Sequence, residues 1–333
     1  MSKPLIKLRF QNGLTFQGFK KEVFDIDNLD SIFHFEESSN PDFIIFGPYG
    51  NDIPPKGDYV RIGYFCENIN PDFSICEWAF GMPREEDIQR ANYKKIQWHN
   101  LLPQNLIKEP EYNPENILAS KTKFCNFLYS HKVPYREAFF KQLSKYKKVD
   151  APGKSMNNMA SIDTLYGGKW DVKKRFLSEY KFTIAFENDI FPGYQTEKLY
   201  DAMQVSSIPI YCGDPFIGDI FNTKSFVNVQ DYIPPQKLNT SLAKLGQMDF
   251  EDIRPSYLKS PRQRIKRKTK SLIRDLNINL QFSKADFSPV IDHIIALDSQ
   301  PELYLQYLKQ PWFNDNAVPE KSSAGKRWVE IFS

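Results

Sequence analysis

Five polar side chains that could bind a ligand lie within twelve positions of one another. They are Glu187, Asn188, Tyr194, Glu197 and Lys198. The apolar, aromatic and β-branched run just before them, residues 182–186, predicts a buried strand. The ammonium of Lys198 and the N–H groups of a helix start suit an anion such as a diphosphate, and Glu197 suits the hydroxyls of a ribose or another sugar. The alternative is a set of solvated charges in a first helical turn.

A second cation, Arg136, lies in the first turn of a predicted helix over residues 136–143, which follows a predicted strand over residues 123–130. A cation at a helix start opposes the helix dipole, so this position is easier to explain if an anion binds nearby. The alternative is an ordinary surface arginine.

A single carboxylate, Glu67, follows the predicted strand over residues 60–65. Polar groups just beyond the carboxyl end of a strand in an α/β sheet are where ligands bind. Glu67 is therefore a candidate catalytic group.

The elements that must position these groups are strands of parallel sheets. Residues 180–215 are typical of a strand, a loop, a helix capped by Thr196 and a second strand over residues 208–211. Further strand patterns at residues 5–10 and 42–46 predict a small α/β domain in the first hundred residues. The proline-bearing residues 83–119 are predicted to be loops that lead to an interdomain linker.

Composition bounds the class of protein. The 333 residues are 41% hydrophobic and 15% aromatic, which suffices for two domains with separate cores. A net charge of +3 argues against a dedicated nucleic-acid binder. The four cysteines and four histidines lack the spacing of a disulfide framework or a zinc site.

Residues 259–274 carry eight basic residues and no acidic one. One interpretation is an amphipathic helix that contacts anionic lipid headgroups, and the other is a solvated helix face after Pro261. The N-terminal apolar run is too short for a signal peptide, and no stretch approaches 18 apolar residues. We therefore expect a cytoplasmic protein, which the lipid interpretation would place on the inner face of the membrane.

The string from Phe186 to Gly213 resembles the signature of the α1,3/1,4-fucosyltransferases, in their bacterial form, which transfer fucose from GDP-fucose. The family pattern is close to F-E-N, a short loop, G-Y-x-T-E-K-x-x-D-A, and then I-P-I/V-Y-x-G. The matching residues are Phe186, Glu187, Asn188, Gly193, Tyr194, Thr196, Glu197, Lys198, Asp201, Ala202, Pro209 and Gly213. The resemblance is strong over residues 180–232, moderate over 123–143 and weak around 61–81.

This resemblance implies an α/β fold of the GT-B class, with two facing Rossmann-like domains that contain parallel sheets. We expect residues 1–115 to form the acceptor-side domain and residues 120–300 the domain that binds GDP-fucose. Residues 301–333 are expected to form a tail that crosses back to the N-terminal domain. Asp25-Ile26-Asp27 resembles the D-x-D motif of metal-dependent glycosyltransferases, but it follows no convincing strand.

The resemblance also implies residue roles. Arg136 matches the arginine that contacts the donor diphosphate. Tyr194, Glu197 and Lys198 match positions that hold GDP-fucose, Asn188 lies at the same strand end, and Glu67 matches the proposed general base. Gln195 stands where aliphatic residues are usual, and Cys212 where a tryptophan is common in bacterial relatives. These departures bear on fine specificity and not on the donor.

The predicted function is an inverting transfer of L-fucose from GDP-fucose to the 3-hydroxyl of GlcNAc in N-acetyllactosamine-type glycans. Such a product is of the Lewis-antigen type found on bacterial surface polysaccharides, including lipopolysaccharide. Glu67 would remove the acceptor proton, and Arg136 and Lys198 would stabilise the departing phosphate, so no divalent metal or further cofactor is expected.

The expected partners are GDP-fucose and an oligosaccharide acceptor, and no nucleic acid. One alternative is a GT-B transferase that uses another sugar nucleotide. The other is a non-catalytic protein that binds glycans or a membrane surface.

Overall fold

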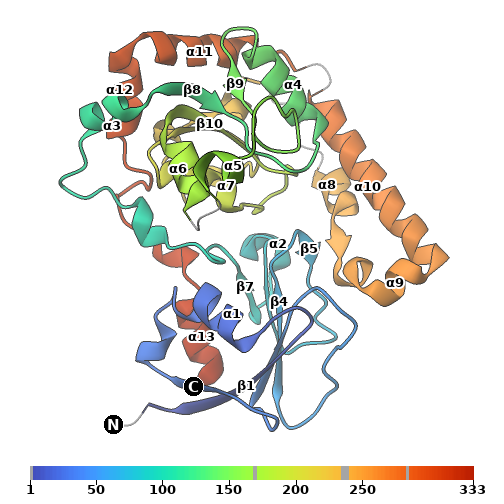
Figure 1. The fold of residues 1–333 in the computed structure, drawn as a ribbon. Helices are drawn as coiled ribbons and strands as arrows, with labels where there is room; N and C mark the ends of the chain where they lie inside the picture. Colours follow the sequence, from blue (N-terminus) through green and yellow to red (C-terminus); the bar gives the residue numbers. More distant parts are fainter. Residues whose placement is uncertain (1–2, 168–170, 234–239, 283–284) are drawn as a thin grey trace. The chain divides into compact units, whose positions relative to one another are not determined.

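Two units, each built around a parallel sheet, make up the chain (Figure 1). The computed structural model describes residues 3–167, 171–233, 240–282 and 285–333. Unit 1 comprises Met1–Leu102, Asn239–Asp275 and Pro319–Ser333, and unit 2 comprises Pro103–Leu238 and Leu276–Val318. The predicted α/β class with parallel sheets is confirmed.

The sheet of unit 1 has the strand order β2-β1-β3-β4-β6-β7, with every neighbouring pair parallel. Its strands are β1 (Leu5–Gln11), β2 (His34–Glu37), β3 (Phe43–Phe46), β4 (Val60–Phe65), β6 (Trp78–Gly81) and β7 (Tyr93–Lys95). The sequence predicted β1, β3 and β4. The other three strands, like β3, have only three or four residues, and β2 and β7 also contain charged side chains, so no apolar run marks them.

The helices of unit 1, and a second sheet made of two strands, come from distant parts of the chain. They are α1 (Phe16–Phe19), α2 (Glu85–Ile88), α8 (Thr240–Gly246), α9 (Pro255–Lys259), α13 (Gly325–Phe332), β5 (Ile69–Asn70) and β13 (Met248–Asp249). On α13 the buried Trp328 stacks on Phe80, with 4.1 Å between the ring centroids. The last helix of the chain is therefore part of the core of unit 1, the unit that also contains the first strand, β1.

Residues 239–275 also belong to unit 1, although the sequence grouped them with residues 120–300. β13 pairs in parallel with β5, and the buried Phe250 lies against Phe65 at 5.1 Å. These contacts join segments about 180 residues apart, which no local pattern could indicate. The segment ends in α10 (Pro261–Phe282), the helix predicted after Pro261.

The sheet of unit 2 has the order β12-β11-β10-β8-β9, again parallel throughout. Its strands are β8 (Lys123–Asn126), β9 (Val149–Asp150), β10 (Tyr180–Phe186), β11 (Ile208–Cys212) and β12 (Val227–Asn228). Its helices are α3 (Pro114–Ser120), α4 (Pro134–Leu143), α5 (Ile162–Tyr166), α6 (Val172–Ser178), α7 (Glu197–Met203), α11 (Ser288–Ser299) and α12 (Pro301–Lys309). Helices α2 and α3 and strand β7 replace the loops predicted over residues 83–119.

The unit β10–α7–β11 has the predicted order of strand, loop, helix and strand. β10 lies between β11 and β8 in the sheet, and most of its side chains are buried because both faces are covered. Such a central strand delivers its carboxyl end, and the residues that follow it, to a fixed position. No helix in the described part of the chain is long and apolar enough to cross a membrane.

Candidate active site

The predicted donor-side residues surround the carboxyl end of β10. The ladder between β10 and β11 continues one residue past β10, because the Glu187 N–H donates to the Cys212 carbonyl at 2.8 Å. Glu187 is fully buried as a result. A buried carboxylate needs donors, and the loop that follows supplies them.

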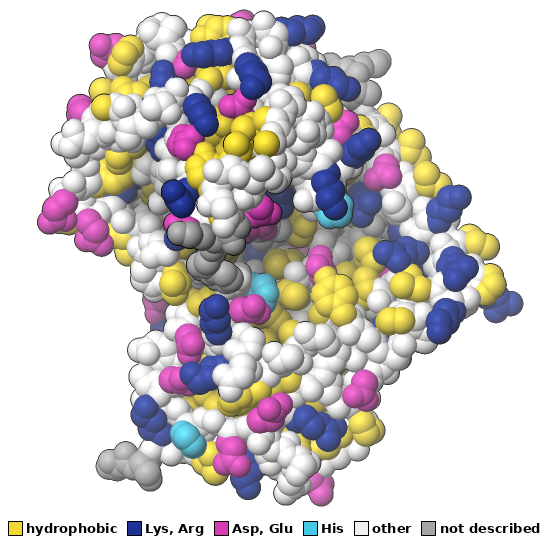
Figure 2. All heavy atoms as spheres, viewed as in Figure 1, with side chains coloured by type: hydrophobic (Ala, Val, Ile, Leu, Met, Phe, Trp, Pro, Cys, Tyr) yellow, Lys and Arg dark blue, Asp and Glu magenta, His cyan; other side chains and the backbone are white. Residues whose placement is uncertain are grey.

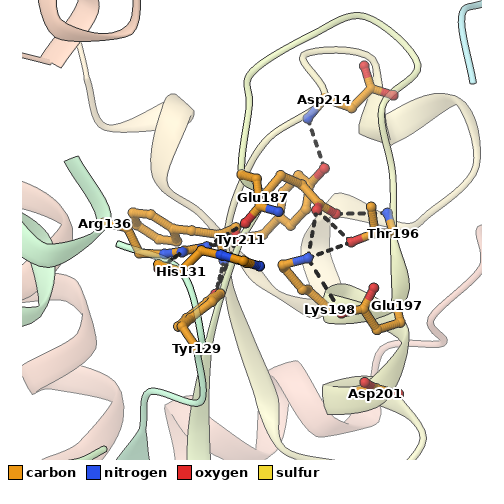
Figure 3. A network of polar contacts seen from close by, with 12 residues as sticks. Tyr129, His131, Arg136, Glu187, Thr196, Glu197, Lys198, Asp201, Tyr211 and Asp214 are labelled. Carbon is orange, nitrogen blue, oxygen red and sulfur yellow. Dashed lines mark hydrogen bonds and ion pairs between the residues drawn. The ribbon is translucent and has the colours of Figure 1, made fainter. Parts of the chain in front are cut away.

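Thr196 and Lys198 provide those donors (Figure 3). The Thr196 backbone N–H donates to Oε1 of Glu187 at 2.9 Å, and its hydroxyl donates to Oε2 at 2.6 Å. The Lys198 ammonium lies 3.5 Å from Oε2 and 2.9 Å from the Thr196 hydroxyl. Thr196 is the predicted N-cap of α7, but its hydroxyl bonds Glu187 instead of capping the helix. Glu187 thus fixes the start of α7 and the position of the Lys198 ammonium.

Electrostatics at this cluster favour a charged Lys198. Burial by itself would lower the pKa of the ammonium, but the carboxylates of Glu187 and Glu197 outweigh burial and raise the pKa. Arg136 also acts on this pKa and lowers it, so the two cations are close enough to repel each other. An anion bound between two such cations would relieve that repulsion.

Arg136 lies in the first turn of α4 and has no exposed surface, so the surface interpretation is wrong. Its Nη2 donates to the His131 carbonyl at 2.6 Å, and its Nη1 donates to the Phe186 carbonyl at 3.4 Å. Its guanidinium carbon lies 3.7 Å from the ring centroid of Tyr129. Its Nε has no hydrogen-bond partner among the described atoms. The cation is held by carbonyl dipoles and an aromatic face, with no carboxylate among these contacts.

Asn188 is an exposed member of this cluster, and its Oδ1 accepts from Nη1 of Arg136 at 3.0 Å. A ligand oxygen that replaced this amide oxygen would find the same guanidinium donor. Glu197 keeps 47% of its side chain exposed beside Lys198, and Tyr194 is buried in the loop before α7. The structure therefore brings Arg136, Asn188, Glu197 and Lys198 together, and the place of these residues in ligand binding remains a prediction.

Two residues organise the site in a way that the sequence did not indicate: Glu187, which was expected only as one of the polar side chains, and Tyr129, which was not singled out. Glu187 holds Lys198, and Tyr129 supports Arg136 while its hydroxyl accepts from the Phe186 N–H at 2.7 Å. The F-E-N string of the motif includes Glu187, but it does not indicate that this carboxylate is buried or that it positions Lys198. Tyr129 follows the short strand β8, and nothing in the local sequence distinguishes it from a core aromatic.

The two departures from the family motif have distinct surroundings. Gln195 is buried, and its Nε2 donates to Oδ2 of Asp214 at 2.6 Å. Asp214 in turn is linked to Tyr211, because its N–H donates to the phenol oxygen at 2.8 Å. Cys212 is buried with a pKa raised by burial, which makes it an apolar core residue. Gln195 thus ties the loop before α7 to the loop after β11.

Glu67 lies in unit 1, two residues after β4 ends, and is half-buried. Its Oε1 accepts a hydrogen bond from the hydroxyl of Tyr49, a 51% exposed side chain in the loop after β3. Burial and the neighbouring Glu67 raise the pKa of Tyr49, so the phenol keeps its proton and acts as the donor. Glu67 is thus a carboxylate at the carboxyl end of a central strand, as predicted.

His99 is a further titratable group near Glu67. Its Nε2 lies 3.8 Å from the Glu22 carboxylate, and its Nδ1 is 3.3 Å from the Tyr64 hydroxyl. Burial lowers the pKa of His99, against the opposing effects of Glu22 and Glu67. Sequence reasoning left His99 out because it carries no motif.

Among the described residues, no group of three or more His, Cys, Asp or Glu side chains could hold a metal ion. Asp27 of the D-x-D string accepts a hydrogen bond from the Ser323 hydroxyl at 2.9 Å. Burial raises the pKa of Asp27, against that bond. Its contact with Ser323, far along the chain, ties this aspartate to the segment before α13.

Two family models match the chain. Residues 118–259 match "Glycosyltransferase family 10 (fucosyltransferase) C-term", and residues 8–99 match "Alpha-(1,3)-fucosyltransferase FucT N-terminal domain". The α-(1,3)-fucosyltransferase FucT of Helicobacter pylori is 29% identical over 223 residues, which is 65% of this chain and 44% of that protein. The α-(1,3)-fucosyltransferase B of Drosophila melanogaster is 38% identical over 120 residues, 33% of this chain and 26% of that protein. The chain thus spans less than half the length of these curated relatives.

Solved structures agree on the fold. A crystal structure of an α1,3-fucosyltransferase matches with a TM-score of 0.65 and 22% identity, over 99% of this chain and 90% of that one. A crystal structure of an α1,3-fucosyltransferase with GDP-fucose matches with a TM-score of 0.64, over 100% of this chain and 90% of that one. At this identity the likeness establishes the fold, which is of the predicted GT-B class. The two family models, which together match residues 8–99 and 118–259, show that the chain belongs to the fucosyltransferases of glycosyltransferase family 10.

Proposed function

We propose that this chain transfers L-fucose from GDP-fucose to the 3-hydroxyl of GlcNAc in an N-acetyllactosamine-type glycan, with inversion at the anomeric carbon. The observation that carries the proposal is the largely buried cluster of Arg136, Glu187 and Lys198 at the carboxyl end of β10. It offers two neighbouring cations, which suits a nucleotide diphosphate. A solved relative of the same fold holds GDP-fucose, which supports the choice of donor.

The donor diphosphate would bind Arg136 and Lys198, with a phosphate oxygen replacing the amide oxygen of Asn188 at the guanidinium. Glu197, half-exposed beside Lys198, would accept hydrogen bonds from ribose hydroxyls, and Tyr194 would pack beside the ribose. As the bond from fucose to the β-phosphate breaks, the charge that grows on the phosphate would be stabilised by the two cations. This positive charge belongs to the protein, so we propose that the chemistry needs no divalent metal.

The acceptor hydroxyl would lose its proton to Glu67 as its oxygen attacks the anomeric carbon. A carboxylate base acting on a sugar hydroxyl follows the logic of an inverting glycosidase, in which the base acts on water. Tyr49 would orient Glu67 through the hydrogen bond that joins their side chains. The product would be a Lewis-type glycan.

The test is a product analysis with the purified chain. GDP-fucose, GDP-mannose and UDP-galactose are each offered with N-acetyllactosamine and lacto-N-biose, in buffer with EDTA. We expect product from GDP-fucose only, with an α1,3 linkage to GlcNAc and unchanged turnover in EDTA. Product from another donor would identify a transferase with a different sugar nucleotide, and no product from any donor would favour a binding protein.

A second proposed role, contact with anionic lipid headgroups at the cytoplasmic face of a membrane, is favoured by the surface of α10. Ile265 is 67% and Leu272 is 53% exposed, and seven residues bring them to the same side of the helix. Arg264, Arg267 and Lys268 line a shallow pocket with Leu258 on the same stretch of the chain, and dark-blue side chains gather over α9 and the start of α10 in Figure 2. Apolar side chains flanked by basic ones suit an anionic lipid surface.

Vesicle sedimentation tests this role. We expect the chain to sediment with vesicles that contain phosphatidylglycerol and not with phosphatidylcholine vesicles, and an Ile265→Ser, Leu272→Ser variant to stay in solution. Equal sedimentation of both proteins would contradict the proposal. A concentration-dependent dimer that the variant abolishes would instead assign this face to a second copy of the chain.

A further inference from the structure

A groove of about 630 Å³ lies on unit 1, outside the residues already given a role. One wall is formed by residues 70–74 with Arg90, and the other by residues 249–251. Grooves of about 300 to 1,000 Å³ are typical of small-ligand sites. We call it the unit 1 groove.

The two walls are held together, so the groove is formed without a ligand. β5 and β13 pair Asn70 with Asp249 across the floor. The ammonium of Lys266 lies 3.1 Å from the Asp249 carboxylate, and Lys270 lies 2.8 Å from Asp252. These ion pairs connect the second wall to α10. Two of the eight basic residues in residues 259–274 therefore have a structural role.

The groove offers the chemistry that sugars require. Phe73 presents an aromatic ring, and the guanidinium carbon of Arg90 lies 4.5 Å from its centroid. Asp72 is turned by hydrogen bonds from Ser74, whose N–H and hydroxyl both donate to its Oδ1, at 2.9 and 2.6 Å. Its other carboxylate oxygen remains an acceptor.

Two charged groups of the groove are left without ion pairs. In the part of the chain that the structure describes, neither the Arg90 guanidinium nor the Glu251 carboxylate has an ion-pair partner. Charges of both signs in one groove suit a neutral ligand that both donates and accepts hydrogen bonds. An aromatic side chain beside a few hydrogen-bonding groups is the composition of small-ligand sites, and an oligosaccharide has hydroxyls that both donate and accept.

The groove begins three residues after Glu67 in the same loop, and the Ile69 N–H donates to the Glu67 carbonyl at 2.8 Å. We propose that the unit 1 groove binds the sugar residues of the acceptor that lie beyond the one receiving fucose. This inference rests on the proposed function, because it takes Glu67 as the base that the acceptor hydroxyl must reach. The specificity for acceptor length then depends on Phe73 and Glu251.

The test compares two acceptors, a disaccharide and a tetrasaccharide that both present N-acetyllactosamine. With the unchanged chain we expect a lower KM for the tetrasaccharide. Glu251→Gln should reduce that advantage about tenfold, since the hydrogen bond from the sugar then has a neutral amide oxygen in place of a charged carboxylate as its acceptor. Phe73→Ala should reduce it about three- to tenfold through loss of the ring face. KM for GDP-fucose and kcat with the disaccharide should not change.

Glu302→Gln, at an exposed position of α12, is the matched control and should keep the full advantage of the tetrasaccharide. An advantage that survives both groove substitutions would overturn the proposal. Saturation-transfer NMR with the tetrasaccharide and the intact chain separates the failure of the groove proposal from the failure of the proposed transferase function. Glycan binding that depends on Glu251 and Phe73 in a chain without transferase activity would refute the proposed function alone, whereas transfer that ignores both residues would refute the groove alone.

Discussion

The carboxylates at the ends of two central strands, Glu187 after β10 and Glu67 after β4, behave differently. Glu187 is fully buried, accepts two hydrogen bonds from Thr196 and lies 3.5 Å from the Lys198 ammonium. Glu67 is half-buried and accepts from the hydroxyl of Tyr49. Glu187 thus has three donors around its two oxygens, whereas Glu67 accepts from one tyrosine hydroxyl. Carboxylates that follow two central strands therefore have different surroundings: Glu187 fixes a cation, and Glu67 contacts a tyrosine hydroxyl.

The difference begins in the backbone. The N–H of Glu187 still donates to the neighbouring strand, at the Cys212 carbonyl, so its side chain starts inside the core. Glu67 lies two residues beyond the last residue of β4, where the chain has already left the ladder. We expect substitutions in unit 2 to change donor affinity and substitutions around Glu67 to change turnover.

The largest expected effect comes from Glu67→Ala. Loss of a general base should lower kcat by about 10²- to 10⁴-fold. The dissociation constant of GDP, measured by calorimetry, should stay within twofold, because Arg136 and Lys198, the proposed ligands of the diphosphate, lie in unit 2. Glu37→Ala, an exposed glutamate on β2, serves as control and should leave both values unchanged. Turnover that survives in the Glu67 variant would mean that the base lies elsewhere.

Lys198→Met should mainly weaken GDP binding, by about 10- to 100-fold, because a charge-assisted contact to phosphate is lost. Calorimetry with GDP measures the change, and Lys224→Met, an exposed position in the same unit, is the control. Unchanged affinity for GDP would remove Lys198 from the donor site and would leave it as the structural partner of Glu187.

Tyr49→Phe tests the surroundings of Glu67, the second carboxylate of the comparison. It removes the hydroxyl that donates to Glu67 and keeps the ring. We expect kcat to fall about three- to tenfold, as for the loss of one partly exposed hydrogen bond to a charged group, with no change in GDP affinity. A fall in GDP affinity with normal kcat would contradict the division of roles between the two carboxylates.

The smallest effect concerns pH and His99. Burial lowers the pKa of this imidazole in the folded chain, so the unfolded chain binds the proton first as the pH falls through about 6.5. Stability at neutral pH is unaffected, and it should decline from about pH 6.5 downwards until the folded imidazole is protonated as well. Chemical denaturation at pH 7.5 and 5.5 measures this, and His99→Gln should show the smaller decline. An equal decline in both proteins would assign the pH dependence to other groups.

Much of the donor side could be predicted from the sequence. The strand, loop and helix around Glu187 lie within one stretch of the chain, so apolar runs and turn residues mark them locally. Arg136 was expected at a helix start and lies there, but its complete burial and its stacking on Tyr129 were not visible. Those features depend on how β8, β10 and α4 pack, and packing leaves no local pattern.

The sequence by itself determined the order of elements around β10, the set of polar residues at its end and, through them, the family. Only the tertiary structure decided that Glu187 orients Lys198, that the end of the chain supplies Trp328 to unit 1, and that residues 249–251 face residues 70–74 across a groove. The physical reason is distance along the chain. Hydrogen bonds and apolar periodicity within about twenty residues leave a pattern in the local sequence. Contacts between segments nearly two hundred residues apart form only when both segments have folded, so no local pattern predicts them.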